Sequence, residues 1–345
     1  MGDSTAALPH AFGGPAGTGV IKTSPEDFIV EELLGFEPSD QGEHVFLRLE
    51  KRGENTEYVA RQLARLAGIP ARDIGYAGLK DRHGKTVQWF SAWLPGKPEP
   101  DWRQLESSSL RILEVRRNGR KLKKGAATGN RFEITVRELK SDPSLLEQRL
   151  KQVAERGVPN YFGTQRFGRD GQNLARASAL FAGTLERVDA HRRGLYLSAA
   201  RSYLFNRILA SRVAQDIWDR AIGGDVFMFP DSHSFFKPDA ITPDIAQRLD
   251  AKKIHPSGAL WGKGTPAVTD QALAMETAIA EEEAELCRGL EDFGLDMARR
   301  PLRLYPEDFR WERCDASLRL RFALPAGAYA TAVLRELVDT DCSDD

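Results

Sequence analysis

The sequence of 345 residues predicts a mixed fold of strands and helices, in which one domain is split by a second, inserted domain. Apolar and polar residues in the first third alternate with the period of strands. Long helical patterns dominate after about Glu155, and a strand pattern returns near the C-terminus. The length also favours about two domains, because domains usually contain about 100–200 residues.

The first predicted elements are a strand and a helix. In His44–Glu50, every second residue is apolar and faces one side, which indicates a half-buried strand. Asn55 is a suitable N-cap for a helix over residues 56–67, and Gly68 and Pro70 end that helix.

Two apolar runs follow, over Ile74–Leu79 and Thr86–Leu94. The polar residues Lys80-Asp81-Arg82-His83-Gly84 lie between them, so the pattern predicts a hairpin or a strand–loop–strand unit with a polar tip. Arg131–Leu139 alternates again and predicts a further strand.

The remainder of the chain is expected to be mainly helical. Helical patterns cover residues 199–216 and 270–289. A strand is expected over 318–324, and the Pro-Ala-Gly turn after it leads into a helix over 330–337.

Composition limits the classes of protein. Hydrophobic residues make up 41% and charged residues 29%, and no apolar stretch has the length of a membrane helix. Residues 1–19 lack the basic and apolar regions of a signal peptide. Cys287, Cys314 and Cys342 are widely separated, which argues against a disulfide framework or a zinc site and favours a reducing cytosol.

The usual cofactor and metal motifs are missing from the sequence. No G-x-G-x-x-G follows a strand, and the histidines show no metal-ligand spacing. Gly258–Gly264 (GALWGKG) resembles a phosphate-binding loop but lacks the required glycine spacing and the Ser or Thr after the lysine. A zinc nucleobase deaminase is excluded because H-x-E and P-C-x-x-C are both absent.

The segment Gly75–Phe90 (GYAGLKDRHGKTVQWF) places the carboxylate of Asp81 at a turn among cationic neighbours. Two interpretations are open from these residues alone. The segment is either a solvated polar loop, or a functional site in which nearby cations keep the carboxylate ionised.

This segment resembles the signature of the TruD family of tRNA pseudouridine synthases, centred on the catalytic aspartate of that family. Four further segments are similar to the same family in the same order, so the resemblance covers nearly the whole chain. They are IKTSPEDFIVEE (21–32), GNRF (129–132), NYFGTQRFG (160–168) and LPAGAYATAVLREL (324–337).

The resemblance implies roles for individual residues. Asp81 matches the nucleophile, and Lys22 matches a basic residue next to it. Tyr329 lies where the family has a phenylalanine that lines the pocket, and its hydroxyl changes the packing there. The positions that hold the target nucleotide are matched by Phe28, Asn130 and Phe132.

Without the resemblance, four of these residues have purely structural interpretations. Phe28 and Phe132 would be core aromatics, Asn130 would cap a turn, and Lys22 would be a surface charge. The motif NYFGTQRFG is expected to pack near the site without a chemical role.

The implied reaction is the isomerisation of uridine to pseudouridine in RNA, in which the C1′–N1 bond breaks and C5 bonds to C1′. The reaction involves no net redox step, so the resemblance implies no cofactor and no metal. Asp81 would attack the sugar or the base, or would stabilise developing charge, and the sequence leaves these routes open. The implied partner is tRNA, with uridine 13 in the D arm of tRNA(Glu) as the target, and no protein partner or membrane is implied.

The resemblance also implies an α+β fold. Residues 1–155 and 303–345 would form a catalytic domain with a mostly antiparallel, mixed sheet. Residues 156–302 would form an inserted TRUD domain, and RNA would lie in the cleft between the two.

A dense basic run is the remaining feature of interest. Six cations without an acid lie between Arg116 and Lys124. They are either a solvated loop or, in a tRNA enzyme, contacts to backbone phosphates.

Two other functions are compatible with parts of this pattern. A non-catalytic RNA-binding or RNA-folding protein is disfavoured by the intact Asp81 and Lys22. A carboxylate-dependent hydrolase of nucleosides or glycosides needs a second carboxylate about 5–10 Å from the first, and none is evident near Asp81 in the sequence.

Overall fold

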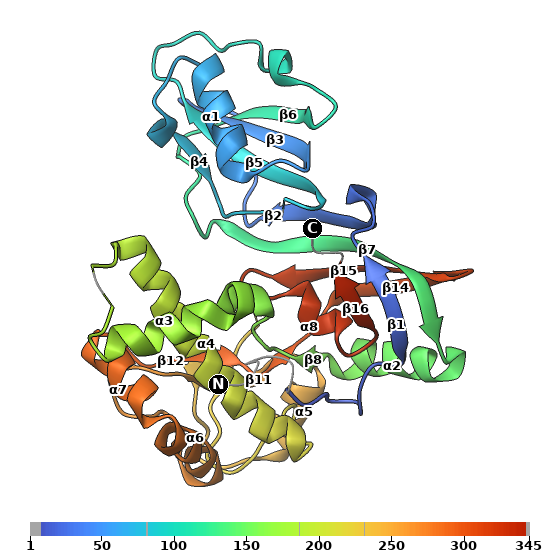
Figure 1. Ribbon diagram of the computed structural model, residues 1–345, viewed down its shortest axis with the longest axis vertical. Coiled ribbons are helices and arrows are strands. Elements are labelled where there is room, and N and C mark those ends of the chain that lie inside the picture. The colour runs from blue at the N-terminus through green and yellow to red at the C-terminus, as the bar shows by residue number, and fades with distance from the viewer. Residues whose placement is uncertain (1–7, 81, 186, 231, 343–345) are drawn as a thin grey trace. The chain divides into compact units, whose positions relative to one another are not determined.

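The computed structural model describes residues 8–342 except residues 81, 186 and 231. The described residues form two compact units, which we call the sheet unit and the helical unit (Figure 1). The sheet unit comprises residues 17–143, 306–327 and 338–342. The helical unit comprises residues 8–16, 144–305 and 328–337.

The helical unit therefore contains the predicted inserted domain, residues 156–302, together with sequence on either side of it. The boundaries of the compact units differ from the predicted domain boundaries after residues 155 and 302. The assignment of 156–302 as a separate functional domain stays a prediction.

The sheet unit is built on one ten-stranded sheet. Its strands are β1 (Gly17–Ile21), β2 (Phe28–Leu34), β3 (His44–Arg52), β4 (Ile74–Tyr76), β5 (Lys85–Trp93), β6 (Leu110–Asn118), β7 (Ala127–Ser141), β14 (Glu307–Cys314), β15 (Ser317–Pro325) and β16 (Asp339–Cys342). The main path runs β14-β15-β7-β2-β5-β3-β6, with β1 between β7 and β16, and with β4 beside β5.

Strand directions in this sheet confirm the predicted fold class. Among the described strands, β1 pairs parallel with β16 and β2 pairs parallel with β5, and all other neighbours are antiparallel. The sheet is therefore mixed and mostly antiparallel, as in an α+β protein.

The helix α1 (Thr56–Leu66) covers one face of the strands β3, β4 and β5 (Figure 1). The predicted N-cap is confirmed, because the side chain of Asn55 accepts a hydrogen bond of 2.8 Å from the backbone of Glu57. Val59 and Leu63 on the apolar face of the helix pack in one core cluster with Phe90 of β5. The apolar face of the predicted helix is thus buried against the predicted strand.

The helical unit contains most of the helices of the chain. They are α2 (Pro143–Arg156), α3 (Gln172–Phe181), α4 (Ala190–Ala214), α5 (Pro243–Asp250), α6 (Asp270–Glu282), α7 (Ala284–Asp292) and α8 (Ala330–Leu334). Its short strands are β8 (Val158–Pro159), β9 (Phe227–Met228), β10 (Phe235–Phe236), β11 (His255–Leu260), β12 (Ala298–Pro301) and β13 (Arg303–Leu304).

The helical pattern over 270–289 forms two helices instead of one. Glu283 lies between α6 and α7 with non-helical backbone angles (φ −114°, ψ 34°). Its carboxylate accepts a hydrogen bond of 2.9 Å from the hydroxyl of Tyr203 on α4, and also binds Arg207. These contacts hold the carboxylate at the break.

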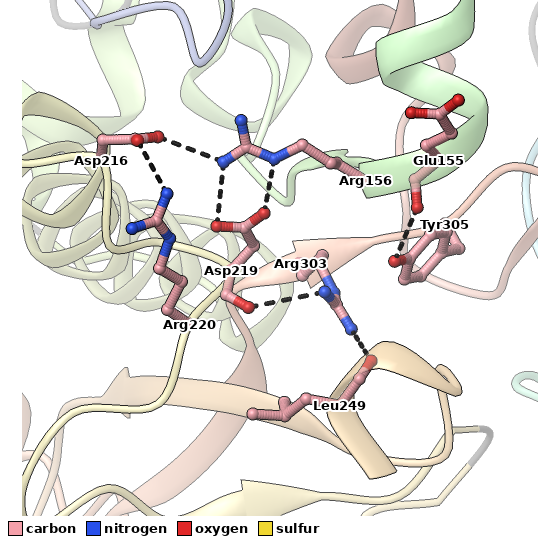
Figure 2. Close-up of polar contacts among 8 residues, drawn as sticks. All are labelled: Glu155, Arg156, Asp216, Asp219, Arg220, Leu249, Arg303 and Tyr305. Carbon is pink, nitrogen blue, oxygen red and sulfur yellow. Dashed lines mark hydrogen bonds and ion pairs between the residues drawn. The ribbon is translucent and has the colours of Figure 1, made fainter. Parts of the chain in front are cut away.

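A polar network connects the end of α2 to β13 (Figure 2). Arg156 donates to the carboxylate of Asp219 at 2.8 Å and 3.1 Å, and Arg303 donates to the backbone carbonyl of Asp219 at 3.4 Å. The predicted domain boundaries, after residue 155 and after residue 302, both fall at this network. This explains why the compact unit extends past both of them.

Candidate active site

Asp81, the predicted nucleophile, lies outside the described residues. Lys22, Phe28, Asn130 and Phe132 all belong to the sheet unit. Tyr329 belongs to the helical unit, so its surroundings are described separately.

Strand register places the predicted nucleotide-binding residues on one face of the sheet. Val30 of β2 lies opposite Phe132 of β7, and Glu32 lies opposite Asn130. Phe28, Val30 and Glu32 alternate along β2 and therefore point to the same side. The side chains of Phe28, Glu32, Asn130 and Phe132 consequently share one face.

The aromatic rings on this face are packed together. The rings of Phe28 and Phe132 meet edge to face with 6.4 Å between centroids, and Phe132 stacks on Phe322 of β15 at 5.5 Å. Phe28 and Phe132 are each only 7% exposed. In this structure both rings are core aromatics, so stacking of a base on Phe132 requires a rearrangement and stays a prediction.

Lys22 follows directly after β1 and lies close to the same aromatic rings. Its ammonium nitrogen is 4.7 Å from the centroid of the Phe28 ring, within the range of a cation–π contact. Its backbone is left-handed (φ 61°), which is uncommon for a residue with a side chain. The predicted basic residue and one predicted pocket aromatic are therefore in contact.

Phe28 is positioned by the residue before it. The carboxylate of Asp27 accepts hydrogen bonds from Ser24 and from Arg137 of β7, the latter at 2.8 Å. Burial raises the pKa of Asp27, but the bonds from Arg137 and Ser24 outweigh burial and hold the pKa below its usual value. This ionised carboxylate ties the start of β2 to β7.

Lys80 lies within the segment Gly75–Phe90, but the sequence analysis assigned it no role. Its ammonium group is 2.8 Å from Oε2 of Glu32 and donates to Oδ1 of Asn130 at 2.7 Å. The Glu32 side chain is fully buried, and its other oxygen accepts from the backbone of Trp89 at 3.2 Å. Glu32 lies within the motif at 21–32, but no local pattern distinguishes it from the neighbouring Glu31 except its place in the strand alternation.

The segment before residue 81 is held at several points. The backbone N–H of Lys80 donates to the Thr56 hydroxyl at 3.1 Å, and that hydroxyl donates to Gln88 at 3.0 Å. The Gln88 amide in turn donates to the backbone carbonyl of Gly78 at 2.6 Å. Thr56 and Gln88 are buried, so these hydrogen bonds form in a low-dielectric region and fix residues 78–80 after β4.

Gly84 allows a close approach between this tip and β2. A Cβ atom at Gly84 would lie 2.5 Å from the backbone oxygen of Phe28. We expect Gly84→Ala to displace the loop or β2, to cost about 1–3 kcal/mol of stability and to lower activity. Gly78→Ala is the matched control, because a Cβ atom there would meet nothing within 4 Å. Equal unfolding midpoints and activities of the two variants would show that the close approach is unimportant.

Tyr329 lies in a cationic and aromatic cluster in the helical unit. Its ring meets Phe162 edge to face at 6.2 Å, and the guanidinium of Arg166 is 5.9 Å from its centroid. Arg300 lies over Phe162 at 4.0 Å, and burial lowers the pKa of Arg300 to about 10. Phe162 and Arg166 come from NYFGTQRFG, so this motif supplies the surroundings of Tyr329.

Part of the basic run is neutralised. Arg116 donates to Asp40 at 2.7 Å and to Glu37 at 3.1 Å, and Arg117 donates to Glu99 at 2.7 Å. The side chains of Arg120, Lys123 and Lys124 are exposed. The number of cations in the run therefore overstates the charge that is free to meet a phosphate.

The fold matches that of a known structure over nearly its whole length. A protein assigned as a tRNA pseudouridine synthase D from Methanosarcina mazei superposes with a TM-score of 0.75, covering 96% of this chain and 95% of that chain at 22% identity. The chain therefore has the fold of that structure.

Sequence comparison identifies the family. The family model for tRNA pseudouridine synthase D (TruD) matches residues 10–174 and 171–337. The chain is 53% identical to the tRNA pseudouridine synthase D of Methylococcus capsulatus over 97% of this chain and 95% of that protein. It is 44% identical to that of Hydrogenovibrio crunogenus over 99% of both. The chain belongs to the TruD family of tRNA pseudouridine synthases.

Proposed function

We propose that this chain isomerises uridine 13 in the D arm of tRNA, with tRNA(Glu) as a substrate, and that Asp81 is the nucleophile. Its family membership supports the isomerase activity. The observation that carries the site is the hydrogen bond between Lys80, the neighbour of Asp81, and Asn130 on the face with Phe28 and Phe132. This hydrogen bond joins the chain neighbour of the proposed nucleophile to a residue assigned to the nucleotide.

The proposed roles follow from the chemistry of a flipped nucleotide. Extrusion of the uridine from its stack costs a few kcal/mol, and stacking on an aromatic such as Phe132 returns about 1–3 kcal/mol. The positive charge of Lys22 keeps the Asp81 carboxylate ionised in a site that excludes water. Tyr329 matches a further position that the family uses for the nucleotide. Asp81 attacks the sugar or the base, and either route needs no net redox step.

The direct test is pseudouridine mapping on tRNA(Glu) transcripts incubated with the purified protein alone. We expect one pseudouridine at position 13 and none when position 13 is cytidine. A modification elsewhere would contradict the proposed position. Binding without any product would favour the alternative, a non-catalytic RNA-binding protein on the same scaffold.

We propose that residues 156–302 and the basic run contribute RNA affinity. Changing the exposed Lys123 and Lys124 to glutamate should weaken tRNA binding and reduce the slope of log affinity against log salt by about 1–2. Changing both to arginine preserves the charge and should preserve the slope. An unchanged slope in the glutamate variant would make the run an ordinary solvated loop.

The proposed location is the cytoplasm, where tRNA substrates occur. Across the described part of the chain, no helix is both long enough and apolar enough to cross a membrane.

A further inference from the structure

The contact between Lys80 and Asn130 fixes the orientation of the Asn130 side-chain amide. A lysine ammonium group carries three donors and no acceptor. The atom of Asn130 that lies 2.7 Å from the Lys80 nitrogen must therefore be the carbonyl oxygen Oδ1. The amide NH2 group then points away from Lys80.

The ammonium group is itself held in place. It is bound at 2.8 Å by the carboxylate of Glu32, which is fully buried and lies directly opposite Asn130 across the strand pair. The backbone of Lys80 is tied to Thr56. A flipped amide would direct its NH2 group at this ammonium, and two donors would then face each other in a buried setting. The observed orientation is therefore strongly preferred.

The free group of Asn130 is a hydrogen-bond donor. The side chain is only partly buried, and Nδ2 has no hydrogen-bond partner among the residues that the structure describes. Asn130 therefore offers a ligand its NH2 group, together with the second lone pair of an oxygen whose first lone pair is used by Lys80.

The two pyrimidines differ in how they match this group. Uracil presents the acceptor O4 beside the donor N3–H, whereas cytosine presents the donor N4–H2 beside the acceptor N3. An amide with its NH2 group toward position 4 pairs with uracil and repels cytosine. Turning the amide over reverses the preference, so a freely rotating asparagine would not distinguish the two bases.

We propose that Lys80, anchored by Glu32, is a specificity-determining residue that locks the Asn130 amide in the orientation that accepts uridine and rejects cytidine. This inference rests on the proposed function, in which Asn130 helps to hold the target nucleotide, and it further places the Asn130 amide against the edge of the base. Lys80 acts through Asn130 and does not touch the base.

The test measures dissociation constants for two tRNA transcripts that carry uridine or cytidine at the target position. All proteins carry Asp81→Asn so that bound uridine is not converted. With Lys80 intact, we expect the uridine transcript to bind about 5- to 150-fold more tightly, as for a matched side-chain contact to a base edge. With Lys80→Met added, Asn130 can turn its NH2 group toward the Glu32 carboxylate, and the ratio should fall to 1 or below.

Two further variants separate specificity from folding. Lys85→Met removes another partly buried lysine, which pairs with Glu50 at 2.9 Å instead of with Asn130, so the ratio should stay as in the parent. If Lys80→Met alone does not fold, Glu32→Gln with Lys80→Met removes both charges and should also bring the ratio close to 1. A parental ratio in a folded Lys80 variant would overturn the proposal.

Failure of the inference is distinguishable from failure of the proposed function. The unaltered protein could form pseudouridine while its Asp81→Asn form binds both transcripts equally. That result would refute the proposed role of Lys80 and support the isomerase activity. If the transcripts bind with the expected ratio and no pseudouridine forms, the proposed orientation of the Asn130 amide is supported and the isomerase activity is refuted.

Discussion

Asp81→Asn should abolish pseudouridine formation, with a loss of about 10⁴-fold or more in rate. Asparagine keeps the size of the side chain and some hydrogen bonding, but it removes the charge and the carboxylate oxygen that we propose as the nucleophile. Thr56 and Gln88 fix the segment that precedes residue 81, so we expect the fold and tRNA binding to be retained. Single-turnover and multiple-turnover assays of pseudouridine would measure the loss.

Asp73→Asn is the matched control for this variant. Asp73 is a partly exposed carboxylate in the same unit, at the end of the short helical turn Ala71–Asp73 before β4. Its replacement should leave the rate within about twofold of the unaltered protein. Multiple turnovers by the Asp81→Asn variant would refute the nucleophile and the mechanism built on it.

Arg212→Met should destabilise the helical unit by about 3–5 kcal/mol. Arg212 of α4 is 1% exposed and pairs with the fully buried carboxylate of Asp225, with one bond of 3.1 Å and a second, shorter bond. Asp225 also accepts from the backbone of Ile222 at 2.9 Å. Without the guanidinium, the carboxylate would remain buried without its counter-ion, which costs far more than the loss of an exposed pair.

The double variant Arg212→Met with Asp225→Asn tests this explanation. The asparagine oxygen can still accept from Ile222, and neither charge remains, so we expect the double variant to recover most of the lost stability. Urea unfolding measures the free energy of unfolding of the single and the double variant. Hydrogen exchange shows whether the change lies within the helical unit. A single variant that loses less than about 1 kcal/mol would show that water or a neighbouring charge compensates Asp225.

Local chemistry made much of the architecture predictable. Three predicted features depend on residues that are close together in the sequence. They are the cap at Asn55, the alternation in β3 and the hairpin of β4 and β5. Periodicity is a local property, and the structure confirms these elements. The motifs likewise named the family, which the comparisons confirm.

The site face depended on contacts that no local pattern contains. Lys80 meets Glu32 and Asn130 across 48 and 50 residues of chain, and Phe132 stacks on a ring 190 residues away. The register of β2, β7 and β15 decides these neighbours, and a shift by one residue would turn each side chain to the other face.

The sequence alone therefore determined the family, the main local elements and the residues to be tested, because each is encoded in short patterns of residue type and spacing. The tertiary structure decided the contacts of Lys80, the packing of Phe28 and Phe132, and the extent of the compact units. Those features depend on buried charges and cross-strand neighbours, whose partners become known only when distant segments pair.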